Sequence, residues 1–195
     1  RNSAPVLSNV KIELSNGKLK ATATDNDITL EGIIDATVDV EGVTTVNASK
    51  LNEIVKKLSE GVALSVELDT NSDRMTITSG KARFNVACIS AESFPATQGI
   101  SGDCTFEVES ESFRKILNRS LFASSKDDSR QYLNGIYMHI AANQKGQDSL
   151  CFVATDGHRL SKSNMILPTG AQNMPGVILP RKAVEKIVSI SRDVP

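Results

Sequence analysis

Hydrophobic and polar residues alternate along much of the chain, a pattern typical of β-strands that bury one face. Alternation runs over 10–14, stops at Asn16-Gly17 and resumes over 19–23. An Asn-Gly pair between two alternating runs is a strong signal for a β-hairpin, so we predict one here. Four further strands are predicted from the same pattern: 28–38, 62–68, 75–78 and 82–87.

Three other segments place apolar residues three or four positions apart, the period of an amphipathic helix: 51–58, 113–121 and 184–188. We expect Asn47 to cap the first helix, Ser110 to cap the second, and Pro180 to lie in the first turn of the third. The segment 98–103 has neither period and is predicted to be a linker.

Internal repeats divide the chain into two similar halves. Three short segments recur 126 to 133 residues later: 7–10 at 133–136, 19–25 at 150–156, and 51–55 at 184–188. A finer repeat, offset by 62 residues, relates Val46 and the helix after it to Val108 and the helix after it. We therefore predict an α+β protein with two copies of one domain, each a doubled strand–helix–three-strand unit. Domain I is placed at 1–97, without its opening strand and helix, and domain II at 104–195, without its last three strands.

Residues that commonly carry catalysis or bind metals are few and scattered. The cysteines, Cys88, Cys104 and Cys151, form no Cys-X-X-Cys pair, which favours free thiols in a reducing cytoplasm. The histidines, His139 and His158, lie in no metal-ligand cluster. No apolar run approaches the roughly 18 residues of a membrane span. We expect a cytoplasmic protein with no catalytic residue, no metal, no cofactor and no membrane partner.

The net charge of −1 conceals an uneven distribution. The segments 50–58, 112–121 and 181–190 together carry an excess of seven basic residues, so the rest of the chain is acidic. We expect these helices to lack Glu–Lys pairs four residues apart, and Arg181 and Lys182 to lie in a first turn, where the helix dipole disfavours cations by roughly 0.3–1 kcal/mol. A solvated helix surface is one explanation. Contact with the backbone of duplex DNA, indifferent to sequence, is the other.

Five segments resemble the bacterial DNA polymerase III beta subunit family, in the family's order and over essentially the whole chain. They are Arg1 with Ala-Pro-Val-Leu at 4–7, Ser-Gly-Lys-Ala-Arg-Phe at 79–84, Tyr-Leu-Asn-Gly at 132–135, Ala-Thr-Asp-Gly-His-Arg-Leu at 154–160 and Val-Ile-Leu-Pro-Arg-Lys at 177–182. The resemblance implies the DNA-clamp fold, a homodimeric ring of six domains with helices lining the hole and antiparallel sheets outside. It implies a non-catalytic sliding clamp, a processivity factor that encircles duplex DNA. The implied partners are DNA bound without sequence specificity, the polymerase III catalytic subunit, the clamp loader and other proteins with clamp-binding motifs.

The resemblance also implies three groups of site residues. Positions that touch DNA in the family are matched by Arg1, Tyr132, Arg181 and Lys182, and the charge on the helices adds Arg114, Lys115 and Lys50. One wall of a pocket for short peptide motifs is matched by Leu133, Thr155, Gly157, His158, Arg159 and Leu160. An edge strand that pairs with the third domain of the partner subunit is matched by Phe84 and Val86. The chain departs from the family at Gln131, where an aromatic residue is common, and the resemblance includes no third domain.

Three alternatives remain on the sequence alone. Asp156 and His158 are two residues apart, so on one strand their side chains would point the same way, as in the acid–base pair of a hydrolase. However, Asp156-Gly157 is a turn signal, and no nucleophile accompanies the pair. A sequence-specific regulator is disfavoured because no helix-turn-helix, zinc or basic-zipper pattern is present. The third alternative is the archaeal or eukaryotic type of clamp, with fewer domains per subunit.

Overall fold

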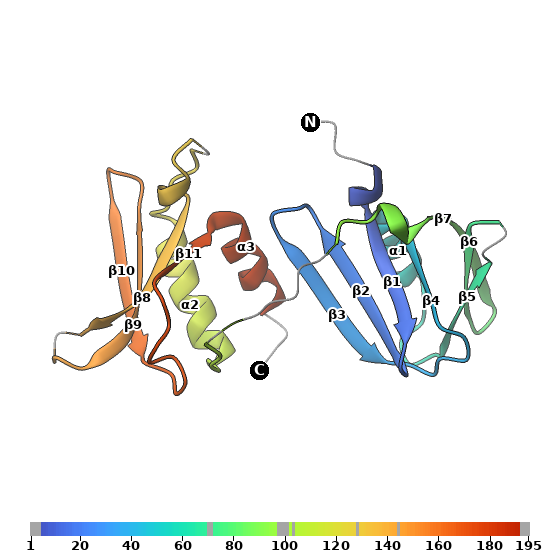
Figure 1. The fold of residues 1–195 in the computed structure, drawn as a ribbon, viewed down its shortest axis with the longest axis horizontal. Coiled ribbons are helices and arrows are strands. Elements are labelled where there is room, and N and C mark those ends of the chain that lie inside the picture. Colours follow the sequence, from blue (N-terminus) through green and yellow to red (C-terminus); the bar gives the residue numbers. More distant parts are fainter. Residues whose placement is uncertain are drawn as a thin grey trace. The chain divides into compact units, whose positions relative to one another are not determined.

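The computed structural model describes residues 5–69, 72–96, 102, 104–127, 129–143 and 145–191. The chain divides into two compact units, Arg1–Gly99 and Ile100–Pro195, which are described separately (Figure 1). Of the predicted linker 98–103, only Gly102 is among the described residues. None of the helices in the described part of the chain is long and apolar enough to cross a membrane.

The first unit is built on a seven-stranded antiparallel sheet. Its order is β3 (Thr29–Asp35), β2 (Lys18–Thr24), β1 (Asn9–Ser15), β4 (Gly42–Asn47), β7 (Ala82–Ile89), β6 (Arg74–Ser79) and β5 (Leu64–Asp69). The predicted hairpin between β1 and β2 is confirmed: Ser15 pairs with Lys18 across Asn16 and Gly17, whose φ angles are 51° and 71°. Positive φ at both turn residues gives the type I′ twist that two-residue hairpins need, which explains the Asn-Gly pair.

The seven strands form two ladders that meet over a short junction. β4 pairs with β7 only through Thr45 with Ile89 and Val46 with Cys88. Over 82–87, β7 pairs with β6, and no described strand lies along its other side. The helix α1 (Ala48–Val55) follows β4, and its Leu51 and Ile54 pack against the core cluster that joins both ladders. That cluster contains Ile12, Val46, Met75, Ile77 and Val86.

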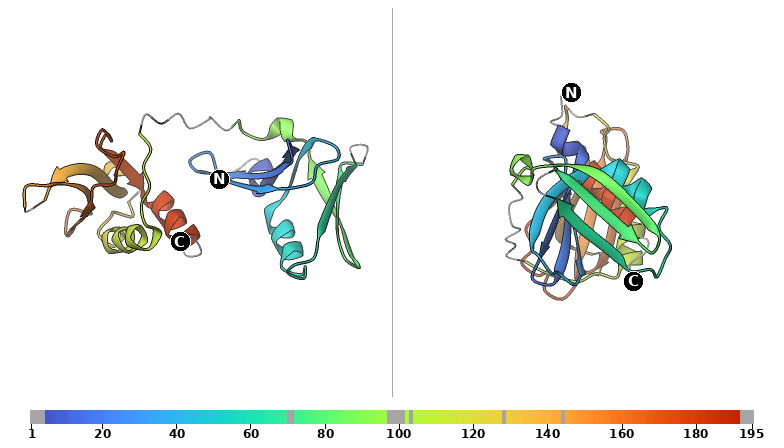
Figure 2. Two further views of the ribbon diagram at one scale, coloured as in Figure 1. Left: turned by 90° about the horizontal axis from the view of Figure 1, so that it is seen from below. Right: turned by 90° about the vertical axis from the view of Figure 1, so that its right-hand side faces the viewer.

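The second unit has a four-stranded antiparallel sheet covered on one face by two helices (Figures 1 and 2). The strand order is β10 (Leu160–Ile166), β9 (Asp148–Thr155), β8 (Gly135–Ala142) and β11 (Val177–Pro180). The helices are α2 (Ser110–Leu121) and α3 (Arg181–Ile190), which contact each other. The described residues of the two units also form three short 3₁₀ helices: η1 (Pro5–Ser8), η2 (Ala91–Ser93) and η3 (Gln131–Leu133).

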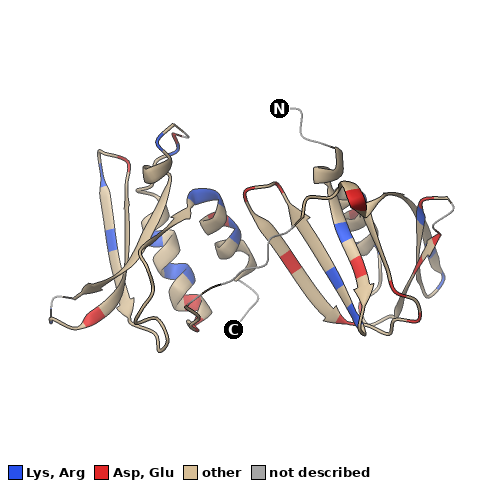
Figure 3. Ribbon diagram, viewed as in Figure 1, with Lys and Arg blue, Asp and Glu red and all other residues tan. Residues whose placement is uncertain are grey.

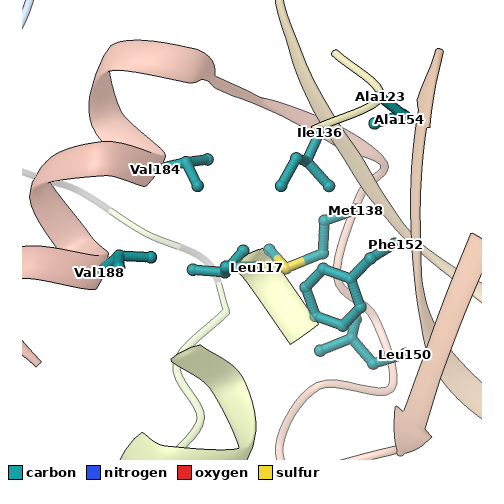
Figure 4. Packing of buried hydrophobic residues seen from close by; sticks show 9 residues of the cluster. All are labelled: Leu117, Ala123, Ile136, Met138, Leu150, Phe152, Ala154, Val184 and Val188. Atoms are coloured by element: carbon teal, nitrogen blue, oxygen red, sulfur yellow. The ribbon is translucent and has the colours of Figure 1, made fainter. Parts of the chain in front are cut away.

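The apolar stripes of α2 and α3 meet the inner face of this sheet. Leu117 of α2 and Val184 of α3 are fully buried and point toward Ile136, Leu150 and Phe152 of the strands (Figure 4). Phe113 adds an edge-on contact with Phe152, with ring centroids 5.9 Å apart. Burial of such side chains stabilises a domain by roughly 1.5–3 kcal/mol each. The packing therefore buries the apolar side of each helix and leaves the opposite side to solvent.

The two units repeat one topology, as the offset segments predict. In each, a 3₁₀ helix leads into three antiparallel strands, a fourth strand returns beside the first of them, and a helix follows. β1, β2, β3, β4 and α1 thus correspond to β8, β9, β10, β11 and α3. This arrangement agrees with the predicted α+β class and its antiparallel sheets.

Three local predictions were wrong. No strand is found at 104–109, around Val108, because no described strand lies beside that segment to complete a ladder of hydrogen bonds. The cap of α2 is Glu109, whose carboxylate accepts from the backbone N–H groups of Glu111 and Ser112 at 3.0 and 2.7 Å. Ser110 instead donates its hydroxyl to the Ser191 carbonyl. Pro180 precedes the first turn of α3 and serves as its N-cap, without a side-chain hydrogen bond.

Gly135 should tolerate no side chain. A Cβ at this buried position would meet the carbonyl oxygen of Leu179 and the side chain of Ile178 on the neighbouring strand. We expect Gly135→Ala to lower the free energy of unfolding by about 1–3 kcal/mol, the usual cost of overpacking. Gly32→Ala, on β3 where a Cβ meets nothing within 4 Å, is the control and should change it by less than about 0.5 kcal/mol. Urea unfolding followed by circular dichroism measures both, and equal stability of the two variants would contradict the prediction.

Candidate functional site

The basic residues expected on α2 and α3 lie on these helices (Figure 3). Two of them are paired with acidic residues of the same helix. Lys115 forms an ion pair with Glu111, and Arg181 pairs with Glu185 at 3.1 Å, both four residues apart. The expected absence of such pairs was therefore wrong. Glu111 was missed because α2 begins at Ser110, two residues before the segment whose charges were counted.

The charge excess of the helices is also smaller than expected. α1 ends at Val55, so it contains Lys50 and Glu53 and carries no net charge, while Lys56 and Lys57 follow it. Each of α2 and α3 keeps an excess of two basic residues. The positive surface of the described helices therefore belongs mainly to the second unit.

Arg181 has a role inside the second unit. Its side chain is only 21% exposed, and Nη1 donates to the Leu121 carbonyl at 3.1 Å and to Ser124 Oγ at 2.8 Å. Leu121 lies in the last turn of α2, where unpaired carbonyls and the helix dipole favour a cation. A bound DNA phosphate is therefore not required to explain why a cation lies in the first turn of α3, because the end of α2 supplies the negative partner.

The other predicted DNA contacts differ in exposure. Lys50, Lys115 and Lys182 are exposed, and Tyr132 in η3 is 71% exposed. Arg114 is half-buried, and its Nε lies out of solvent without a hydrogen-bond partner in the structure. Arg1 lies outside the described residues.

Five of the six predicted pocket residues lie at the turn between β9 and β10. Thr155 closes this turn: its Oγ1 donates to the Arg159 carbonyl at 2.7 Å and accepts from the Gly157 N–H at 3.1 Å. Gly157 has a φ of 91°, a conformation that favours glycine. His158 is exposed, and its backbone N–H donates to Asp156.

Asp156 anchors the Arg159 side chain to this turn. Its carboxylate accepts from the backbone N–H groups of His158 and Arg159, both at 3.0 Å, and from the Arg159 Nε at 2.9 Å. The hydrogen bond from the His158 N–H is the main cause that holds the Asp156 pKa below its usual range. A carboxylate held ionised by three N–H donors is a weak base, which disfavours the hydrolase alternative. No cluster of metal-ligating side chains occurs among the described residues.

Leu133, the sixth predicted pocket residue, is joined to the turn through the segment 119–125 at the end of α2. The Ser125 N–H donates to the Leu133 carbonyl at 2.9 Å, and the Arg119 carbonyl accepts from Ser161 Oγ at 3.1 Å. The structure thus brings all six residues to one end of the second unit. Leu160, at the start of β10, is 65% exposed and gives this surface an apolar centre.

Phe122 was missed by the sequence reasoning. It follows the last residue of α2 and is 55% exposed, and the Arg159 guanidinium carbon lies 5.5 Å from its ring centroid. The signal available was an aromatic residue one position beyond the apolar stripe that ends at Leu121. Asp156 was considered as an acid or base and as part of a turn signal, but its contact with the Arg159 side chain was not predicted.

Phe84 and Val86 lie on β7 with their side chains turned inward. Val86 belongs to the core of the first unit, and Phe84 packs against it. Arg83, Asn85 and Ala87 alternate with them, and Arg83 and Asn85 are exposed. Pairing with another chain along 82–87 would therefore use the backbone of β7 and the outward residues.

The Arg181 contacts should contribute measurably to stability. Arg181→Lys keeps the positive charge but cannot reproduce both the hydrogen bonds to α2 and the pair with Glu185. We expect it to lower the free energy of unfolding of the second unit by about 1–3 kcal/mol. Lys186→Ala, at an exposed position of α3, is the control and should cost less than about 0.5 kcal/mol. Tyrosine fluorescence during urea unfolding reports this unit alone, because both tyrosines, Tyr132 and Tyr137, lie in it; an unchanged midpoint for Arg181→Lys would refute the structural role.

Comparison with known proteins gives a consistent result over the whole chain. Residues 1–98 match the family model of the DNA polymerase III beta subunit, N-terminal domain, and residues 107–194 match that of its central domain. The beta sliding clamp of Caulobacter vibrioides is 37% identical over 186 residues, covering 94% of this chain and 49% of the relative. That of Rickettsia bellii is 37% identical over 194 residues, covering 99% of this chain and 49% of the relative.

Solved structures agree with the sequence comparison. The polymerase III beta structure of Caulobacter crescentus has a TM-score of 0.91 and 34% identity, covering all of this chain and 53% of that one. A sliding clamp from Bartonella birtlesii, bound to griselimycin, has a TM-score of 0.86 and 37% identity, covering 98% of this chain and 50% of that one. The chain spans about half the length of these relatives. On both family models and on the shared fold, the chain belongs to the DNA polymerase III beta subunit family.

Proposed function

We propose that this chain forms part of a DNA sliding clamp, a non-catalytic processivity factor that encircles duplex DNA and tethers the replicative polymerase. The observation that carries the proposal is membership of the beta subunit family over both units. The repeated topology supports it, because a ring can be built from copies of one unit. Residues 1–97 and 104–195 are proposed as the first two domains of a three-domain subunit, and two such subunits form the ring.

The DNA-facing surface is proposed to be the polar side of the helices. The sheet side of α2 and α3 is occupied by the core, so their exposed basic residues lie away from the sheet. Exposed lysines suit contact with phosphates, which gives salt-dependent binding without sequence preference. Lys50, Lys115, Lys182 and Tyr132 are the described residues we assign to this contact, while Arg181 supports it from within.

The turn between β9 and β10 is proposed as one wall of a peptide-binding pocket. Leu160 and the stem of Arg159 give an apolar surface, and Thr155 and His158 give polar groups at its edge. An extended peptide with Leu and Phe anchors suits such a surface. The polymerase III catalytic subunit, the clamp loader and other motif-bearing proteins are the proposed partners, in the cytoplasm. The open side of β7 over 82–87, the strand that holds Phe84 and Val86, is proposed to pair with the partner subunit.

Encirclement predicts that retention on DNA depends on the topology of the DNA. In a protein of the family's full length that contains these residues, we expect stable retention on circular duplex and release after a single cut that makes the DNA linear. Retention should be independent of base sequence and should weaken with salt. Gel filtration of labelled protein with circular or linearised plasmid measures this. Equal retention on both forms of DNA would contradict encirclement.

Charge reversal tests the DNA-facing surface in the same assay. Lys182→Glu on α3 should shorten retention on circular DNA by about two- to tenfold, because one phosphate contact becomes a repulsion. Lys162→Glu is the matched control. Lys162 is exposed on β10, on the face of the strand opposite to Met165, which packs against the core. We expect this control to retain DNA like the wild type. An equal effect of both variants would show that net charge, and not the helix surface, controls retention.

Peptide binding should depend on the start of β10 and not on its end. Isothermal titration of the full-length protein with a peptide carrying Leu and Phe anchors should give a Kd in the micromolar range, about −8 kcal/mol. Leu160→Lys should abolish binding by placing a charge at the apolar centre. Ile166→Lys is the control: Ile166 is 90% exposed at the other end of the same strand, six residues away. Loss of binding in both variants would contradict the assigned site.

A further inference from the structure

Phe122 is an exposed aromatic residue at the end of α2. It lies outside the core cluster of the second unit, although Leu117 and Ala123 on either side belong to it. The end of α2 is held by other contacts, namely Arg181 on Leu121 and Ser161 on the Arg119 carbonyl. Loss of the Phe122 side chain should therefore leave the fold intact. An exposed ring that stability does not require calls for another explanation.

The ring completes the immobilisation of Arg159. The Arg159 carbonyl accepts from Thr155 Oγ1, its backbone N–H and its Nε donate to Asp156, and its guanidinium carbon lies 5.5 Å from the Phe122 ring centroid. A guanidinium over an aromatic face is attracted by the ring quadrupole. The head of Arg159 is thus held between a carboxylate and a ring. The orientation of its stem is thereby restricted at the turn that carries the proposed peptide-binding residues.

We propose that Phe122 is a positioning residue of the peptide-binding surface, which acts by holding Arg159 in the orientation that presents its aliphatic stem to the peptide. This role rests on the proposed function. Without the ring, Asp156 still binds the Arg159 Nε, but the guanidinium regains rotational freedom. Peptide binding must then order a long side chain, and that ordering weakens affinity.

A double-mutant cycle on the full-length protein tests this role. Phe122→Ala should weaken peptide binding by about two- to fivefold, as expected for an exposed cation–π contact. Phe122→Tyr keeps the ring and should bind like the wild type, whereas Phe122→Leu keeps the apolar character without the ring and should bind like Phe122→Ala. In an Arg159→Ala background, Phe122→Ala should have no further effect, because the residue through which it acts is gone.

Each outcome decides between stated alternatives. A loss that persists in the Arg159→Ala background would mean that Phe122 touches the peptide itself and would overturn the positioning role. Full binding by Phe122→Leu would show that the ring is not required and would overturn it as well. Wild-type protein that binds no peptide would refute the proposed function, whereas wild-type binding that Phe122→Ala leaves unchanged would refute only this inference. The Arg159 Nε–H resonance gives a separate readout: the ring current should shift it in the wild type and in Phe122→Tyr, but not in Phe122→Leu.

Discussion

The end of α2, residues 119–125, is the element on which the rest of the second unit depends. It accepts the Arg181 guanidinium at the Leu121 carbonyl, receives the Ser161 hydroxyl at the Arg119 carbonyl, and donates the Ser125 N–H to Leu133. These contacts join α3, β10 and η3 to one helix end. Their geometry is fixed in turn by Leu117, which is fully buried one turn earlier. A helix terminus offers unpaired carbonyls, and here they are satisfied by the segments that carry the proposed sites.

Some basic residues of the second unit form contacts inside the unit, and others are exposed at its surface. Arg181 and Lys182 are adjacent in sequence, yet the first is mostly buried against α2 and the second is exposed. Successive residues of a helix lie about 100° apart, so neighbours of like charge can face different surroundings. Counting basic residues along the sequence therefore overstates the positive surface. The basic residues that a polyanion could reach are those whose side chains are exposed, as those of Lys115 and Lys182 are.

Periodic features of this chain could be predicted from sequence because their signals are local. The β1–β2 hairpin follows from Asn16-Gly17, and the repeat follows from segments that fold into equivalent strands. The ends of the helices were harder to predict. Either Glu109 or Ser110 could cap α2, and Glu109 does so because its backbone is extended, whereas Ser110 is already helical.

The remaining features could not be predicted, since they depend on contacts between distant segments. Arg181 is 60 residues from Leu121, and no periodicity in the sequence relates them. Arg159 and Phe122 are 37 residues apart, and their contact depends on the fold bringing the end of α2 next to the turn after β9. The strand expected around Val108 is not formed, for the same reason. A strand needs a neighbouring strand to pair with, and the residues of one segment do not show whether such a neighbour is present.

The two corresponding helices, α1 and α3, start in different ways. Asn47 caps α1 with its own side chain, which accepts from the Lys50 N–H at 3.1 Å. Pro180 gives α3 no such bond, and the first residue of that helix is held instead by the end of α2. The cap of α1 therefore joins residues within four positions of one another in the sequence. The Arg181 hydrogen bonds at the start of α3 exist only when the end of α2 lies beside it, so truncating the end of α2 should weaken the start of α3, whereas the start of α1 has no such dependence.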